Sequence, residues 1–166
     1  MNYHVVPMTE AHIADFHQAL DSVAREHDYL AFLEAPPLDN TRDFVLHNIE
    51  HGRPQFVALR EGRVVGWCDI AASQRPVFTH AGTLGMGIVA PHRGRGLGRT
   101  LLEATIAKAR ATGIERIELT VREKNARAIA LYEKMGFVHE GRHVNSVKIG
   151  QRYENHLSMA LWLGHM

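Results

Sequence analysis

The densest group of chemically useful residues in this sequence is a loop rich in glycine and arginine, RGRGLGR at 93–99. It lies between an apolar, strand-like run and an amphipathic stretch typical of a helix. Glycines let backbone N–H groups converge on an anion, and the first turn of a helix adds unpaired N–H donors and a partial positive charge. The loop therefore predicts a diphosphate site. The residues expected to hold the anion are Arg93, Gly94, Arg95, Gly96, Leu97, Gly98 and Arg99.

Two familiar phosphate-binding motifs fit this loop poorly. A Walker-type loop needs GxxxxGK(S/T), but Arg93 stands five residues before Gly98, and Arg99 replaces the lysine. The dinucleotide fingerprint GxGxxG lacks its third glycine after Gly94 and Gly96. A glycine-rich turn with solvated arginines is the interpretation without a function. Taken alone, the loop indicates phosphate binding and does not identify the ligand.

A longer stretch around this loop, IVAPHRGRGLGRTLLEATIAKA, resembles motif A of the GCN5-related N-acetyltransferases, with the signature (R/Q)xxGx(G/A) between a strand and a helix. Arg93, Gly96 and Gly98 fill that signature. Asn125 and the segment ARAIALYEKMGF at 126–137 resemble the second cofactor-binding segment of the family. The whole pattern, including the late GQRYENHLSMAL, is most similar to bacterial phosphinothricin-type and amino-acid-type N-acetyltransferases.

The resemblance implies acetyl-CoA as co-substrate and assigns roles to several residues. The strand around Ile88 and Val89 would separate from its neighbour and bind the pantetheine arm, because pantetheine amides can pair with a free strand edge. One N–H near Ile88 would polarise the thioester carbonyl. Asn125 would contact the cofactor, and Tyr132 would protonate the leaving thiolate as general acid. On spacing alone, Tyr132 fits a core aromatic residue equally well.

The residue that accepts the proton of the attacking amine is harder to locate. Many family members carry a glutamate on the strand before motif A, but that strand reads TLGMGIV here and has no carboxylate. Glu34, Asp69, His80 and Glu118 remain candidates, and each also fits an ordinary hydrogen-bonded or solvated group. The residues expected to bind the substrate are Phe32, Glu34 and Asp69, the first two from an apolar loop beside the cleft.

Other reactive residues are weaker candidates. His47 and His51 fit the zinc-peptidase pattern HxxEH, but Gly52 follows at once and no obvious third ligand appears, so we expect no metal. Cys68 lacks a paired histidine and fits a buried apolar role. A basic group near the C-terminus could hold a carboxylate, although scattered solvated charges explain it as well. That group consists of Arg142, His143, Lys148 and Arg152.

Composition narrows the class of protein. The 166 residues, 45% hydrophobic and 22% charged, fit one globular domain over residues 1–166. A formal net charge of +1 is too small for a general nucleic-acid binder. One cysteine excludes an internal disulfide, and neither a membrane span nor a secretory signal is evident, so we expect a cytoplasmic protein without a membrane partner. A homodimer is a hypothesis that the family resemblance suggests.

Periodicity predicts the elements that position these residues. Strands are expected at 3–6, 55–60, 63–70, 82–89 and 114–121, and helices at about 9–23, 40–51, 97–111 and 125–135. The segments 137–142, 144–149 and 153–163 close the sheet as two or three further strands. Three consecutive strands without a crossover helix exclude a purely parallel sheet. We therefore expect a single-domain α/β (α+β) fold with a mixed, mostly antiparallel sheet flanked by helices, as the family resemblance also implies.

The first functional hypothesis is direct transfer of the acetyl group of acetyl-CoA to a primary amine of a small molecule, such as an amino acid or analogue. Acetylation of a protein N-terminus, an aminoglycoside or a polyamine is an alternative within the enzyme class. A non-catalytic acyl-CoA-binding module is an alternative outside it, supported by the missing strand carboxylate. Thiol release with mixed amines would separate an enzyme from a binding module.

Overall fold

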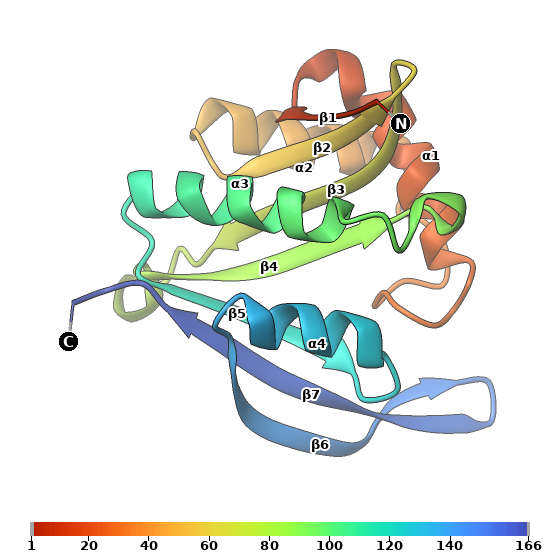
Figure 1. The fold of residues 1–166 in the computed structure, drawn as a ribbon, viewed down its shortest axis with the longest axis vertical. Helices are drawn as coiled ribbons and strands as arrows, with labels where there is room; N and C mark the ends of the chain where they lie inside the picture. The colour runs from red at the N-terminus through yellow and green to blue at the C-terminus, as the bar shows by residue number, and fades with distance from the viewer. Residues whose placement is uncertain (1, 166) are drawn as a thin grey trace.

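The computed structural model describes residues 2–165 and contains a seven-stranded sheet with the order β1-β2-β3-β4-β5-β7-β6 (Figure 1). The strands are β1 Tyr3–Pro7, β2 Gln55–Arg60, β3 Arg63–Ala72, β4 Ala81–Ile88, β5 Arg116–Arg122, β6 Val138–Ile149 and β7 Arg152–Trp162. Five of the six neighbouring pairs are antiparallel, and β4 with β5 is the parallel pair. The predicted mixed, mostly antiparallel sheet is confirmed.

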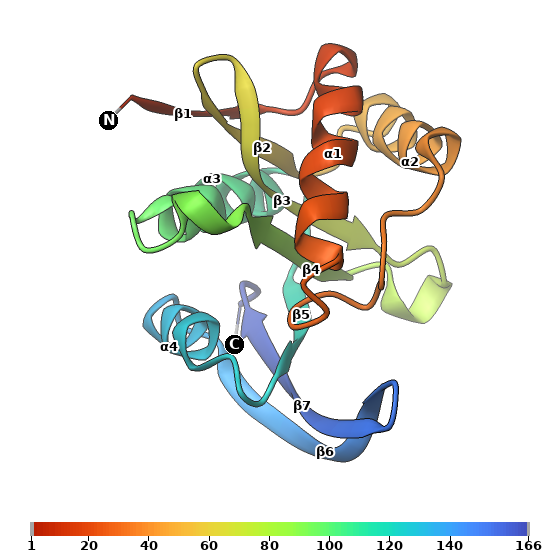
Figure 2. The same cartoon turned by 90° about the vertical axis from the view of Figure 1, so that its right-hand side faces the viewer.

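Four α-helices cover the two faces of the sheet. They are α1 Ile13–Ala24, α2 Leu38–Glu50, α3 Leu97–Ala111 and α4 Ala126–Lys134. Figure 2 shows α1 and α2 on one face and α3 and α4 on the other. The apolar stripes expected from the sequence point inward: Ile13, Phe16 and Val23 of α1 are buried, as are Leu101 and Leu102 of α3. Within residues 2–165, no helix combines the length and apolarity that crossing a bilayer requires.

The C-terminal hairpin is formed by β6 and β7. The predicted strands 137–142 and 144–149 form one strand, β6, whose pairing with β7 shifts register after His139 and again after His143. Asn145 adopts a left-handed conformation with φ 54°, and its N–H donates to Asn155 Oδ1 over 2.8 Å. A hydrogen bond from the backbone to a side chain thus replaces a backbone hydrogen bond between β6 and β7. The residues between His143 and Val147 therefore form a bulge, and β6 continues beyond it. Of the two or three closing strands that the sequence allows, the structure has two, β6 and β7.

Two groups of buried side chains pack on opposite faces of the sheet, one under α3 and α4 and one under α1 and α2. The group under α1 and α2 contains a tight contact between β3 and β4. On the α1 face, Trp67 of β3 stacks edge-on against Phe16, with 5.6 Å between ring centroids. Gly87 lies across from Trp67 on β4. A Cβ atom at Gly87 would lie 2.4 Å from the indole ring. The indole therefore occupies the space that a side chain on β4 would need.

We expect Gly87→Ala to lower the free energy of unfolding by about 2 kcal/mol, because a methyl group would overlap a ring that Phe16 holds in place. Gly85→Ala is the matched control on the same strand, since its new methyl group would approach no heavy atom closer than 3.5 Å. Urea unfolding of both variants measures the difference. Equal unfolding midpoints for Gly87→Ala and Gly85→Ala would show that Trp67 can move aside.

Candidate active site

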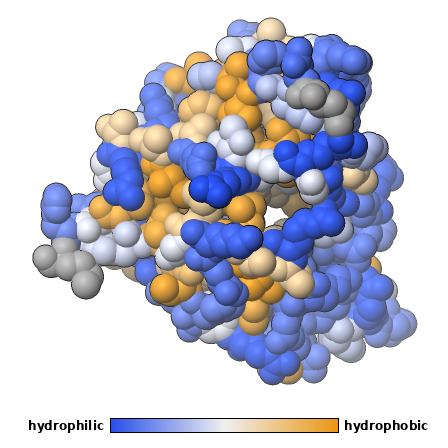
Figure 3. All heavy atoms as spheres, viewed as in Figure 1, coloured by the Kyte–Doolittle hydropathy of each residue, from blue (hydrophilic) through white to orange (hydrophobic). Residues whose placement is uncertain are grey.

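A large cleft begins where β4 and β5 stop pairing. Their parallel register covers only Ala81–Thr83 against Arg116–Glu118, and beyond these residues the strands diverge. A cleft of about 1520 Å³ follows the gap, lined by β4, β5, α4, the 93–99 loop and part of the α1–α2 connection. Figure 3 shows the surface hollowed between α3 and α4, near the N-terminal end of α3. The predicted separation of the strand around Ile88 is therefore present.

The divergence leaves one edge of β4 without a neighbouring strand. The N–H of Val89, just after β4, donates to Val65 O of β3 over 2.9 Å. Backbone groups of successive strand residues point to alternate sides, so the N–H groups of Met86 and Ile88 point toward the gap. The carbonyl of Ile88 already accepts a bond from Arg93 Nε at 2.8 Å. This edge can pair with an extended ligand that carries amide groups.

Unpaired backbone donors gather at one end of the cleft. Gly94 and Gly96 adopt left-handed conformations with φ 73° and 82°, which turn the chain sharply before Leu97 starts α3. The helix has no side-chain cap, and its first internal bond runs from Thr100 N to Gly96 O. The N–H groups of the first three helical residues therefore have no acceptor within the helix. Residues 94–99 form the anion-binding geometry expected from the sequence.

The charge of the lining favours an anionic ligand. Among the described residues, five cationic side chains and two carboxylates border the cleft, although the whole chain carries a net charge of only +1. The cations are Arg93, Arg99, Lys124, Arg127 and Lys134, and the carboxylates are Asp28 and Asp69. Arg127, from the first turn of α4, was missed in the sequence because nothing in its spacing connects it to the 93–99 loop. Arg93, Arg99 and Lys124 are paired with Glu26, Glu103 and Asp28, so within residues 2–165 Arg127 and Lys134 supply the positive charge that is not already paired.

The side chain of Arg93 pairs with groups of the protein itself. Its guanidinium group binds Glu26 through two bonds of 2.9 and 2.5 Å, and it lies over the ring of Tyr29 with 4.5 Å to the ring centroid. Glu26 and Tyr29 belong to residues 25–37, which connect α1 to α2 and are called here the α1–α2 loop. Arg93 therefore fastens this loop to the end of the cleft where α3 begins. Its predicted role in anion binding stays a prediction, and its guanidinium charge is already paired with Glu26.

Two further cations hold the same loop from β5 and its end. Arg122 is buried, donates to Leu30 O over 2.8 Å and pairs with Glu154 of β7 at 3.4 Å. Lys124 pairs with Asp28 at 2.7 Å and with Glu154 at 3.1 Å. The α1–α2 loop is therefore attached to both sides of the gap between β4 and β5.

Asp69 is the buried carboxylate at the middle of the cleft. It lies on β3 opposite Gly85 of β4, and it is 8% exposed. Its carboxylate makes no hydrogen bond or ion pair with any of residues 2–165, and burial raises its pKa to about 7. Gly85 carries no side chain that would cover it. A carboxyl group with a pKa near neutrality beside a ligand cleft can accept a proton during a reaction.

Tyr132 of α4 lines the cleft from the opposite face of the sheet. It is 6% exposed, packs against Phe137 and makes no side-chain hydrogen bond with the described residues. Burial raises the pKa of its phenol above the ordinary value of 10, so the hydroxyl keeps its proton at neutral pH. The ring is therefore part of the core and also borders the cleft, and its predicted role as general acid stays a prediction.

The remaining predicted site residues divide into two groups. Phe32 and Asn125 line the cleft, and Asn125 Oδ1 also caps α4 by accepting from Ala128 N at 3.2 Å. Three others lie outside the lining, namely Glu34, Val89 and Arg95. Glu34 is exposed and pairs with Arg25 at 3.1 Å, on the outer side of the α1–α2 loop.

Two other candidates for the proton acceptor also lie away from the cleft. Glu118 is half exposed and pairs with Arg116 at 3.4 Å. His80 precedes β4, and its ring lies against Trp162 at the opposite end of that strand. Asp69 is therefore the candidate from the sequence that the fold places in the cleft.

Other candidate groups do not converge on a site. His51 follows the last residue of α2, and its Nδ1 lies 2.9 Å from His47 O. Within residues 2–165, no three His, Cys, Asp or Glu side chains gather as a metal site would require. Cys68 is fully buried, and burial raises its pKa, which keeps the thiol protonated.

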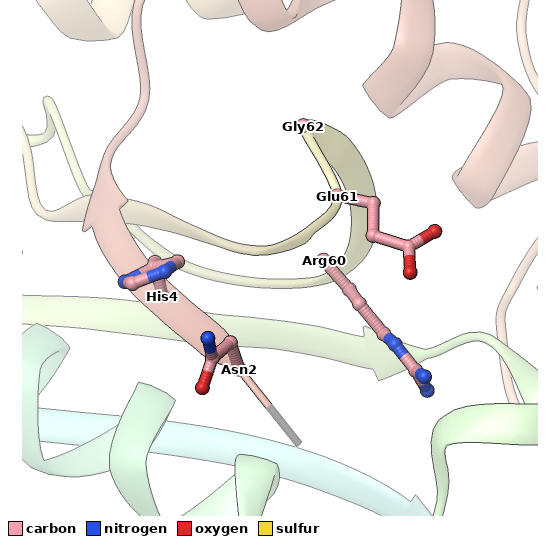
Figure 4. A pocket seen from close by; sticks show the side chains of 5 residues that line it. All are labelled: Asn2, His4, Arg60, Glu61 and Gly62. Carbon is pink, nitrogen blue, oxygen red and sulfur yellow. The ribbon is translucent and has the colours of Figure 1, made fainter.

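A second, shallow hollow of about 580 Å³ lies at the turn between β2 and β3, beside β1. Figure 4 shows that the side chains of Arg60 and Glu61 extend away from Asn2 and His4. Its polar groups therefore do not converge on one point, and the cleft between β4 and β5 is the better candidate site.

Comparison with known proteins agrees with this geometry. A family model described as "Acetyltransferase (GNAT) family" matches residues 16–137. The L-amino acid N-acetyltransferase AaaT of Escherichia coli (strain K12) is 37% identical over 91 residues, which cover 54% of this chain and 56% of that protein. The chain thus spans little more than half the length of this relative.

Solved structures share the fold over nearly the whole chain. The acetyltransferase of GNAT family from Streptococcus pneumoniae is 26% identical with a TM-score of 0.90, over 97% of this chain and 99% of that one. A GNAT superfamily phosphinothricin acetyltransferase from Sinorhizobium meliloti, in complex with AcCoA, is 19% identical with a TM-score of 0.91, over 99% of this chain and 90% of that one. The predicted fold resemblance is confirmed.

The Arg93–Glu26 pair gives a prediction about stability. Glu26→Gln leaves a largely buried guanidinium group without its carboxylate, so we expect the free energy of unfolding to fall by about 1–2 kcal/mol. Glu34→Gln removes an exposed partner of Arg25 from the same loop and should cost less than about 0.5 kcal/mol. Chemical denaturation of both variants tests this. Similar losses in the two would mean that the Arg93 pair does not fasten the loop.

Proposed function

The chain belongs to the acetyltransferase (GNAT) family, and we propose that it transfers the acetyl group of acetyl-CoA directly to a primary amine of a small molecule, such as an amino acid or an amino-acid analogue. The observation that carries this proposal is the cleft between β4 and β5, which has unpaired backbone donors at one end and Asp69 and Tyr132 on opposite sides of its middle. The similarity to an L-amino acid N-acetyltransferase supports the acceptor class.

The residues of the cleft fit acetyl-CoA. The backbone N–H groups of residues 94–99 suit its diphosphate, and Arg99 and Arg127 add positive charge beside them. The free edge of β4, with the N–H groups of Met86 and Ile88, suits the amides of pantetheine. When bound, acetyl-CoA supplies an acetyl group activated as a thioester. The N–H of Ile88 would stabilise negative charge that develops on the acetyl oxygen.

Asp69 is proposed as the group that accepts the proton of the amine. On the α1 face of β4, positions 85 and 87 are glycines, and the residues of β4 on that face include no carboxylate. The carboxylate of Asp69, on the neighbouring strand, lies beside the space that Gly85 leaves free. Since burial raises its pKa to about 7, Asp69 is basic enough to take a proton from an ammonium group and can ionise at neutral pH.

Tyr132 is proposed as the proton donor to the departing sulfur. The amine nitrogen forms a bond to the acetyl carbon, the carbon–sulfur bond breaks, and the nitrogen loses a proton to Asp69. The thiolate receives a proton from the Tyr132 hydroxyl, which solvent then reprotonates. Because a thiol with a pKa near 8.5 leaves tolerably without help, the contribution of Tyr132 should be moderate.

The pH dependence tests the role of Asp69. We expect kcat/KM to rise with pH through about 7, because the carboxylate form is the active one and forms above its pKa. Asp69→Asn should lower kcat/KM about 100-fold or more and remove this inflection, leaving only that of the amine substrate. Glu118→Gln, which removes an exposed carboxylate outside the cleft, is the control and should leave the profile unchanged. A normal profile in Asp69→Asn would exclude Asp69 as the base.

Substitution of the phenol tests Tyr132. Tyr132→Phe keeps the packing against Phe137 but removes the hydroxyl, so we expect kcat to fall about 10- to 100-fold. The affinity for acetyl-CoA, measured by calorimetry, should change little because the ring remains. An unchanged kcat would remove Tyr132 from the proton transfer.

If CoA binds but no amine stimulates thiol release by the unmodified protein, the chain is a binding module and the proposed transfer is wrong.

A further inference from the structure

The acceptor side of the cleft differs in character from the diphosphate end. Trp67, Asp69 and Ala71 alternate along β3 on the face that carries α1 and α2, as the contact between Trp67 and Phe16 shows. Tyr132 borders the same cleft from the face that carries α4. Since the unpaired α3 donors and α4 occupy that second face, an amine reaches Asp69 from the α1 and α2 face.

Three aromatic side chains border this entrance and remain partly exposed, although the Arg93 guanidinium group lies over one face of the Tyr29 ring. Tyr29 and Phe32 come from the α1–α2 loop and Phe44 from α2, and they are 39%, 46% and 38% exposed. Apolar side chains of Leu20 and Val23 lie deeper in the lining. Aromatic residues grouped around a concave opening, and left exposed there, are typical of a site whose ligand covers them.

The nearby charges already have partners in the protein. Lys124 pairs with Asp28 and Glu154, Arg122 pairs with Glu154, and Arg93 pairs with Glu26. A charged group on the acceptor that entered this side would lose its water without gaining an unpaired partner from these groups. An apolar group would instead gain free energy by covering the aromatic rings.

We propose that the acceptor carries, beside its primary amine, an apolar group of about the size of a leucine or phenylalanine side chain, which packs against Tyr29, Phe32 and Phe44. This inference rests on the proposed acetyl transfer and narrows its substrate class. The amine meets Asp69 while the apolar group lies toward the α1–α2 loop. A free amino acid and the N-terminus of a peptide share this chemistry.

The first experiment compares acceptors that differ in one side chain. Phenylalaninamide and leucinamide should be acetylated with a kcat/KM about 10- to 100-fold above those of serinamide and lysinamide. Free phenylalanine and a tripeptide with an N-terminal phenylalanine distinguish the two sources of the same group. Equal or higher kcat/KM for serinamide or lysinamide would overturn the inference while leaving the proposed acetyl transfer intact.

Substitutions of the aromatic residues test whether they cause the preference for an apolar acceptor. Phe44→Ser should raise KM for phenylalaninamide about 10-fold and change KM for serinamide little, because only the larger group covers the ring. Phe78→Ser is the matched control, since Phe78 is 50% exposed but lies outside the cleft lining. An equal effect of the two substitutions, or none from Phe44→Ser and Phe32→Ser, would contradict the placement.

Binding provides a readout that does not depend on turnover. Calorimetry with the protein saturated by CoA should detect phenylalaninamide and show about 10-fold weaker binding in Phe44→Ser. If this binding occurs but no amine releases thiol, the proposed transfer fails and the aromatic site stands. If thiol release occurs with serinamide while phenylalaninamide neither binds nor reacts, the aromatic site fails and the transfer stands.

Discussion

The site depends on two parallel strands that stop pairing. After Thr83 of β4 and Glu118 of β5, backbone groups that would bond within a sheet face a gap. Protein interiors rarely leave such groups without partners, so a gap of this kind persists where water or a ligand can reach it. The same divergence connects the two faces of the sheet. Asp69 and Tyr132, which belong to opposite faces, can therefore border one cleft.

The glycines of β4 explain why the carboxylate lies on a different strand. Gly87 makes room for Trp67, and Gly85 leaves the space beside Asp69 open. A larger residue at 87 would collide with the indole ring, and a side chain at 85 would stand between Asp69 and the gap. At positions 85 and 87 the face of β4 toward α1 is therefore backbone alone, and the carboxylate beside the cleft comes from β3. The absence of a carboxylate on β4 and the open space beside the Asp69 carboxylate of β3 thus both follow from the glycine at position 85.

Local signals in the sequence were sufficient for most of the elements and for the glycine-rich turn before α3. The stripe of α3 and the glycines of residues 94–98 are short-range patterns, and the structure has both. Ion pairs between residues far apart in the chain could not be predicted from the sequence. Arg93 and Glu26 lie 67 positions apart, so an arginine in a glycine-rich loop gave no sign that its charge was already paired. The exposed position of Glu34 could not be predicted either, because hydrophobic periodicity does not say which way a side chain of a loop points.

Asp69 also weakens the fold that holds it. Its pKa of about 7 in the folded protein exceeds the ordinary value of 3.8, so the folded state keeps a proton that the unfolded chain releases between these two pH values. The free energy of unfolding therefore falls as pH rises from about 4 to 7, and the whole cost is present above pH 7. A neutral residue of similar size would avoid this cost. A buried carboxylate without a partner, at the centre of a ligand cleft, is better explained by proton transfer than by stability.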